Sequence, residues 1–259
     1  MSERPRRVTT ADGGDRAVSD VVAFVLTFSV VVLSVGVVSG VGFSVMEEIR
    51  GDEQALNAQR ALQTLGESLN EIDRRQVPGR SGEISLSGGT LLADSGADGP
   101  AFEVRTSTGE TFTTEAGRIR YRSGDDTRVL VENGAVIRED ESADQGIVVQ
   151  RPNVVCEGGA NPYAVVSVVK FVADVNGIGG DGTVQVVGRE QSSTLLYSDD
   201  DATSVTVDYS GSEFSDAWET YFSRTGEWQS VDDTDAVCDV GSDGRVIVRR
   251  TVVEIDFVS

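Results

Sequence analysis

The sequence predicts an α+β protein in which one long N-terminal helix packs on an antiparallel, β-rich domain. Three observations lead to this prediction: an uncharged run over 21–46, an amphipathic helical pattern after it, and short strand-like segments between turns from Gly82 onward. With 259 residues, 39% hydrophobic and 25% charged, the chain has room for one sizeable globular domain, or two small ones, besides a membrane segment.

The uncharged run from Val21 to Met46 has only serines and one threonine as polar side chains. As a helix at about 1.5 Å per residue it would reach about 39 Å, more than the roughly 30 Å hydrocarbon core of a bilayer, so it can span with tilt. A secretory signal peptide has a shorter apolar region of about 7 to 15 residues, so this segment is expected to be retained.

Cations on the two sides of the run favour a cytoplasmic N-terminus and an exterior C-terminal domain. Four arginines precede the run and two follow it closely: Arg4, Arg6, Arg7 and Arg16, then Arg50 and Arg60.

The residues just before the run resemble a known processing signal. Asp15-Arg16-Ala17-Val18-Ser19-Asp20-Val21-Val22 is similar to the class III signal of archaeal type IV pilins and related surface proteins. In that family a membrane prepilin peptidase cuts after a small residue that follows a basic one. The resemblance implies that Arg16, Ala17, Val18 and Asp20 are recognised, that residues 1–17 form a leader, and that the mature chain begins at Val18.

One position departs from the family pattern. Many pilins carry a glutamate at the fifth mature position, where this chain has Val22. The only early acid is Asp20, which would pair with the new amino group of a neighbouring subunit, because a carboxylate at membrane depth needs a partner. An ordinary single-span anchor, in which Arg16 only follows the positive-inside rule, is the alternative interpretation.

Small residues mark one face of the expected membrane or filament-core helix, residues 18–46. Gly36, Gly40 and Ser44 recur at four-residue spacing. Such residues let helix backbones approach closely, so we expect this face to contact other pilin-like subunits. Glycine is also common in membrane helices that do not assemble.

Apolar residues at three- and four-residue steps predict that the helix continues over 47–76. They are Ala55, Ala58, Leu62, Leu65, Leu69 and Ile72, with Glu53, Arg60, Glu67, Asn70 and Asp73 expected on the other face. The helix should end before Pro78-Gly79, and its apolar stripe should pack against the sheets. The pilin resemblance implies the same arrangement.

Residues 82–259 are expected to form the acidic, β-rich exterior domain. Asn133-Gly134 predicts a type I′ hairpin, and further strands are expected at 118–121, 128–131, 163–172, 183–187, 204–209 and 245–258. A helix over 212–222 would align Phe214, Trp218, Tyr221 and Phe222 on one face and stop at Gly226. We interpret that aromatic face as core rather than as a sugar-binding surface.

Two cysteines, Cys156 and Cys238, fall in this domain. Outside the cell an even pair predicts one disulfide, with two free buried thiols as the alternative. The spacing does not say whether the two Cα atoms come close enough for a bridge.

The composition is strongly acidic, with 43 Asp and Glu against 22 Lys and Arg, a net charge of −21, and Lys170 as the only lysine. Such a surface repels nucleic acid and attracts cations. We favour adaptation to very high salt, where screening lengths fall to about 3 Å at 1 M and self-repulsion is harmless. The source is therefore expected to be a halophilic archaeon, with no nucleic-acid partner.

Enzymatic function is disfavoured, and neither catalytic residues nor a cofactor are predicted. The chain has no histidine, which removes the commonest general base and metal ligand, and Lys170 is interpreted as structural. The segment 174–182, from Asp174 to Asp181 and Gly182, resembles part of a calcium loop but lacks the third acid and the terminal glutamate of an EF-hand. A glycine-rich turn fits as well, so no metal site is assigned.

These features predict a type IV pilin-like subunit of a cell-surface filament used in adhesion, or of a secretion-like apparatus. A mature chain of 242 residues is large for an abundant pilin, which favours a minor subunit. Its expected partners are the prepilin peptidase, other pilin-like subunits and the lipid membrane. It should be single-pass with an extracellular C-terminal domain, or part of an extracellular filament. The alternative is an anchored exterior binding domain that does not assemble.

Overall fold

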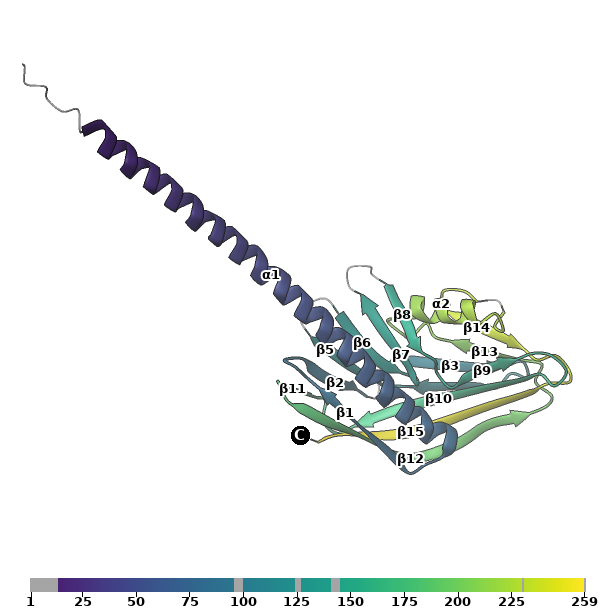
Figure 1. Ribbon diagram of the computed structural model, residues 1–259. Coiled ribbons are helices and arrows are strands. Elements are labelled where there is room, and N and C mark those ends of the chain that lie inside the picture. The colour runs from purple at the N-terminus through teal and green to yellow at the C-terminus, as the bar shows by residue number, and fades with distance from the viewer. Residues whose placement is uncertain (1–13, 96–99, 124–126, 141–144, 230, 259) are drawn as a thin grey trace, which may run out of the picture. The chain divides into compact units, whose positions relative to one another are not determined.

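The computed structural model describes residues 14–95, 100–123, 127–140, 145–229 and 231–258. The chain divides into two units, Met1–Arg50 and Gly51–Ser259. Helix α1 (Gly14–Arg75) supplies the described part of the first unit and continues into the second (Figure 1). The described part of the second unit is mostly strands, with one further helix, α2 (Ser215–Thr225). The predicted α+β layout, an N-terminal apolar helix followed by a strand-rich body, is confirmed.

The described strands of the body form three sheets. The five-stranded sheet has the order β1 (Gly79–Ser85), β12 (Thr183–Asp199), β15 (Arg245–Val258), β10 (Tyr163–Ala173), β9 (Val154–Glu157). The six-stranded sheet has the order β11 (Gly177–Gly179), β2 (Thr90–Asp94), β5 (Arg118–Ser123), β6 (Thr127–Glu132), β7 (Ala135–Asp140), β8 (Gln145–Gln150). The four-stranded sheet has the order β14 (Asp235–Asp239), β13 (Ser204–Asp208), β3 (Ala101–Thr106), β4 (Thr111–Glu115).

Strands β10 and β15 form a parallel pair, an exception to the predicted antiparallel arrangement of the domain. Tyr163 lies opposite Arg245 and Ala173 opposite Ile255. Parallel neighbours need a long crossover connection. Here β11 to β14 and α2 lie between the two strands in the chain, which lets β15 return in the direction of β10.

The hairpin predicted at Asn133-Gly134 is confirmed. It joins β6 to β7, with Val131 opposite Val136. Asn133 and Gly134 have φ angles of 45° and 75°. Positive φ at both central residues is what a type I′ turn requires.

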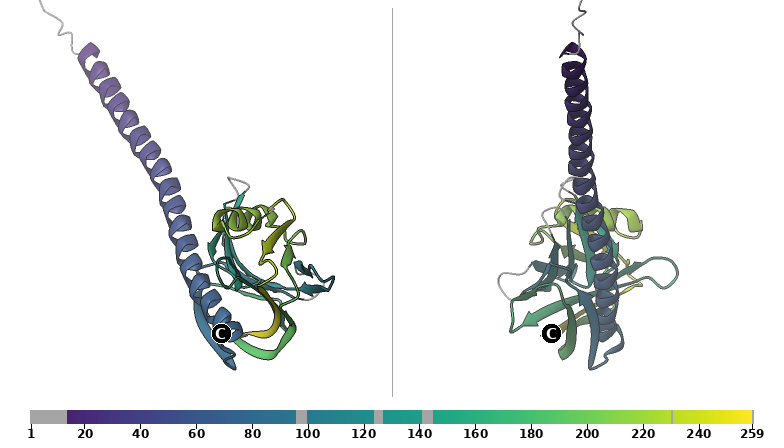
Figure 2. Two further views of the ribbon diagram at one scale, coloured as in Figure 1. Left: turned by 90° about the vertical axis from the view of Figure 1, so that its right-hand side faces the viewer. Right: turned by 60° about the vertical axis from the view of Figure 1, so that its left-hand side comes forward.

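The second half of α1 packs on the sheets as the apolar stripe predicts. Leu62, Leu65, Leu69 and Ile72 are fully buried, in one core cluster with residues of the five- and six-stranded sheets. Figure 2 shows this part of the helix against the strands. The side chain of Ala55 lies outside the described residues.

The predicted polar face of α1 is partly wrong. Glu67 is exposed as expected, but Asn70 and Asp73 are fully buried. Strands cover more of the helix than its apolar stripe indicates, and both polar side chains find hydrogen-bond partners there. Asn70 Nδ2, for example, donates to the carbonyl of Gly134 over 2.7 Å.

Helix α2 belongs to a second core cluster, which includes residues of all three sheets. Phe214, Trp218 and Phe222 are buried, and Trp218 makes an edge-on contact with Phe102 at 5.2 Å between ring centroids. Gly226 ends the helix in the left-handed conformation, as predicted. The interpretation of this aromatic face as core is confirmed for Phe214, Trp218 and Phe222, and Tyr221 is partly buried against the same cluster.

Candidate functional site

The apolar surface of the first unit is the first candidate site. Val21–Gly40 is a 20-residue helical segment with a mean hydropathy of 2.8, long and apolar enough to cross a membrane. Its large side chains are exposed, Phe24 by 69% and Val38 by 71%. Contiguous exposed apolar surface marks a membrane or protein interaction site, because water does not favour it.

Predicted residues of the N-terminal signal lie at the edge of the described structure. The backbone of Arg16, Ala17, Val18 and Asp20 is helical, since α1 begins at Gly14. Their side chains lie outside the described residues, as does most of the expected leader, residues 1–17. Their recognition by a peptidase stays a prediction.

The predicted packing face is open where it is described. Gly36 and Gly40 lie in the exposed segment, and no atom beyond their immediate backbone surroundings lies within 4 Å of the position of a Cβ on either residue. The side chain of Ser44 lies outside the described residues. Two neighbouring small residues on an open helix face leave room for the backbone of another helix.

A buried carboxylate holds the C-terminal end of α1 on the five-stranded sheet. Asp73 Oδ1 accepts hydrogen bonds from Ser167 Oγ at 2.7 Å and from Thr251 Oγ1 at 2.6 Å. Asp73 Oδ2 accepts from Asn153 Nδ2 at 2.7 Å, and the Arg249 guanidinium lies 3.3 Å from Oδ1. A buried carboxylate is costly without partners, and here every partner is a donor. The network therefore fixes α1 to β10 and β15.

The helical pattern placed Asp73 on the polar face and so missed this anchor. One signal in the sequence could have found it. A carboxylate in the last turn of a helix faces the negative end of the helix dipole, an unfavourable position unless another group compensates.

A second buried carboxylate joins the β6–β7 hairpin to α2. Glu132 Oε1 accepts from Ser212 Oγ at 2.5 Å and from Trp218 Nε1 at 2.8 Å. Burial raises the pKa of Glu132, while these two hydrogen bonds act in the opposite direction. Both carboxylate networks join elements distant in sequence, which suits a structural role.

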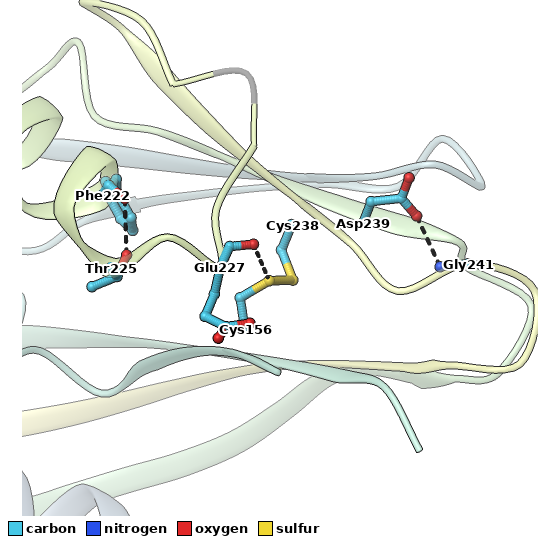
Figure 3. Close-up of a disulfide and its surroundings, with 7 residues drawn as sticks. All are labelled: Cys156, Phe222, Thr225, Glu227, Cys238, Asp239 and Gly241. Atoms are coloured by element: carbon cyan, nitrogen blue, oxygen red, sulfur yellow. Dashed lines mark hydrogen bonds between the residues drawn. A yellow bond between two sulfur atoms is a disulfide. The ribbon is translucent and has the colours of Figure 1, made fainter. Parts of the chain in front are cut away.

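Cys156 and Cys238 form the disulfide expected from the sequence, with 5.7 Å between their Cα atoms (Figure 3). It joins β9, an edge of the five-stranded sheet, to β14, an edge of the four-stranded sheet. Figure 3 also shows the Glu227 carbonyl beside Cys156 Sγ, 3.2 Å away. A bridged sulfur carries no hydrogen, so this is a close contact rather than a donated hydrogen bond.

The segment 174–182, which resembles part of a calcium loop, forms a short strand and a turn. Gly177–Gly179 forms β11, which pairs with β2, and the amide of Gly180 donates to the carbonyl of Gly89 over 3.2 Å. Among the described residues no group of three Asp, Glu, His or Cys side chains could hold a metal ion. Asp200, in the acidic run Asp199-Asp200-Asp201, is exposed and pairs with Arg245.

Comparison with known protein families gives a match over most of the chain. Residues 16–256 match a family of unknown function (DUF7289). The match covers both the apolar helix and the β-rich body, and it begins at Arg16. No curated protein and no solved structure matches the chain.

Proposed function

This chain belongs to the DUF7289 family, and we propose from its own residues that it is a type IV pilin-like, minor subunit of a cell-surface filament or secretion-like apparatus. In this proposal prepilin peptidase cuts between Ala17 and Val18. The apolar helix then holds the mature chain in the membrane or in the filament core, and the acidic body lies outside the cell. The role is structural and non-enzymatic.

The observation that carries the proposal is the exposed segment Val21–Gly40. Its large apolar side chains are exposed, apart from contacts along the helix such as that of Phe24 with Phe28, whereas the body buries its own apolar residues in two clusters. The proposal therefore assigns the cover of this surface to lipid or to the helices of other subunits. At about 1.5 Å per residue, the 20 residues span about 30 Å, the thickness of a bilayer core.

The way α1 is held supports a structural subunit. The helix is continuous from Gly14 to Arg75, and its last turns are fixed in the body by the apolar stripe and by the Asp73 network. A pull on the apolar part of the helix would therefore be transmitted to packed side chains and buried hydrogen bonds, as a filament subunit requires.

The net charge of the chain indicates the environment in which it would assemble. A chain of net charge −21 with a single lysine repels its own copies at low ionic strength. In molar salt the screening length falls to about 3 Å, so acidic bodies can lie side by side. We place the protein on the surface of a halophilic archaeon.

A membrane-anchored exterior domain that does not assemble is the second candidate, favoured by Val22 at the position where many pilins have a glutamate. The two candidates differ in processing. An anchor keeps residues 1–17, whereas a pilin-like subunit loses them.

Substitution at the expected cut separates them. Ala17→Phe should block processing and filament incorporation but leave the chain in the membrane fraction. Ala11→Phe, the same substitution within the expected leader, is the matched control and should be processed normally. If Ala17→Phe changes neither the mass of the mature chain nor its presence in sheared surface filaments, the proposal fails.

A further inference from the structure

A groove lined by arginines crosses the body of this acidic chain. Its main cavity, of about 620 Å³, lies between strand β9 and the end of α2. Two adjoining cavities of about 480 and 210 Å³ share Arg151 with it, and extend it along α1 and along β8. Cavities of a few hundred Å³ are the size of ordinary ligand sites. We call the three together the arginine groove.

The charge of the arginine groove is opposite to that of the chain. Its lining contains five arginines and three glutamates, a net charge of +2, in a chain of net charge −21. The arginines are Arg60, Arg74, Arg151, Arg224 and Arg249, and the glutamates are Glu67, Glu157 and Glu227. An anionic ligand is repelled by the body as a whole and finds local attraction here.

Among the described residues, most groove arginines have no carboxylate within 4 Å. Arg74, Arg151 and Arg224 are exposed and form no ion pair with a described residue, and only Arg249 has one, to Asp73. Eight arginines outside the groove each lie within 4 Å of a carboxylate: Arg75, Arg80, Arg105, Arg118, Arg120, Arg128, Arg189 and Arg245. The groove therefore keeps its guanidinium groups available for a planar, bidentate acceptor such as a carboxylate.

An open sheet edge lies along the same groove. Strand β9, all four residues of which line the main cavity, pairs only with β10 among the described strands. The amide of Ser167 donates to the carbonyl of Asn153, which makes these two a hydrogen-bonded pair. Since such pairs alternate along an antiparallel ladder, the backbone groups of Val154 and Cys156 point away from β10, toward the edge that no described strand covers. The two residues are 5% and 6% exposed, with their side chains in the core.

The side chains around β9 also give the groove a small apolar surface beside its arginines. Val155 is 40% exposed and lines the main cavity, with Trp228 on the other wall. Thr225 and Glu227 also line this cavity, and Figure 3 shows them to the left of the disulfide, with Asp239 and Gly241 on its other side. The groove thus offers backbone groups, a small apolar surface and unpaired guanidinium groups together.

We propose that the arginine groove binds an extended acidic segment of another protein chain, which adds as a strand to β9 and places carboxylates on Arg74, Arg151 and Arg224. Strand addition satisfies the open backbone groups of an edge, and alternate side chains of the added strand give specificity. A peptide with a carboxylate at every second residue fits both requirements. This proposal does not depend on cleavage or assembly at the N-terminus.

The test uses the full chain in detergent micelles, in salt in which circular dichroism shows it folded, and a fluorescent six-residue peptide of alternating glutamate and valine. Anisotropy should show saturable binding that weakens as salt is raised, because exposed charges are screened. The double substitution Arg151→Gln and Arg224→Gln should weaken binding by about tenfold or more, since hydrogen bonds to charged groups are the strong ones. Both side chains are exposed and unpaired among the described residues, so the fold should be retained.

Controls separate strand addition from general attraction to charge. Arg122→Gln, at an exposed arginine that does not line the groove, should leave the affinity unchanged. Of two peptides methylated on alternate backbone amides, one should bind and the other should not, because only one set of amides faces β9. The proposal is overturned if the peptide does not bind, if the double substitution has no effect, if both methylated peptides bind equally, or if polygalacturonate binds as tightly at equal carboxylate concentration.

Discussion

Asp73→Ala should strongly destabilise the body, because it removes the acceptor at the centre of the helix anchor. Three buried donors, on Ser167, Thr251 and Asn153, would lose this acceptor. Asn153 Nδ2 keeps the Asn70 carbonyl at 3.3 Å and Thr251 Oγ1 keeps Ser193 Oγ at 3.3 Å, and a buried group left with no partner costs about 1–3 kcal/mol. Hydroxyl rotation recovers part of this, so we expect a total loss of about 3–5 kcal/mol, as for a broken buried ion pair. For a domain of this size that lowers the melting temperature by roughly 6–20 °C.

The two tryptophans, Trp218 and Trp228, make the assay specific for the body. Both are buried in the cluster that contains α2, so their fluorescence reports on the body and not on the apolar helix. Asp73→Asn should have an intermediate effect. Its side-chain carbonyl still accepts from two hydroxyls, but its NH2 group would face the NH2 group of Asn153, and two donors form no hydrogen bond. Glu67→Ala, at an exposed site on the same helix, is the control and should change stability by about 0.5 kcal/mol or less. A melting temperature for Asp73→Ala within about 2 °C of the wild type would refute the reasoning.

Three other perturbations have defined outcomes. Replacing Cys156 and Cys238 by serine should lower the free energy of unfolding by about 4.5 kcal/mol, because the bridge closes 82 residues of chain. Equal urea midpoints for the wild type with and without reductant would contradict this. Burial raises the pKa of Glu132, so the folded state holds the proton to higher pH than the unfolded state, and stability is lost as pH rises from about 4.5 through the folded pKa. Glu132→Gln should remove that loss, because glutamine does not ionise. The free energy of unfolding of the variant minus that of the wild type should therefore change between pH 4 and pH 8, and a constant difference would contradict this prediction. Gly134→Ala should cost about 1 kcal/mol or more, because Gly134 has a φ of 75° and a Cβ would lie 2.3 Å from Asn70 Oδ1; an unchanged melting curve would show that the turn relaxes.

Local patterns in the sequence predicted the parts of the fold that local physics determines. The uncharged run and the apolar stripe define α1, and Asn133-Gly134 defines its hairpin, because each depends on residues within a few positions of one another. Strand β15 was likewise predicted over its full range, 245–258. Each of these segments has a strong apolar or turn signal of its own.

Non-local pairing explains what the sequence did not reveal. Strand β12 continues to Asp199, well beyond the predicted 183–187, although its second half is mostly polar. It is held there by pairing with β15, with two register shifts that keep the strands aligned. The parallel pairing of β10 with β15 depends on the path of the intervening chain and has no local signal.

The candidate sites also divide into those with a local sequence signal and those that only the fold brings together. The apolar surface of α1 was visible in the sequence, because 20 consecutive residues carry it. The Asp73 network was not, because its donors come from the segment before β9, from β10 and from β15. The arginine groove combines Arg74, Arg151 and Arg224, from α1, a loop and α2, and only the folded chain brings them together.

The N-terminus of the protein in native membranes tests the central claim most directly. Mass spectrometry of the intact chain and of its N-terminal peptide should find a mature protein that begins at Val18, with residues 1–17 removed and the apolar helix retained. A chain that begins at Met1 or Ser2 would contradict the pilin-like assignment, even if the helix spans the membrane.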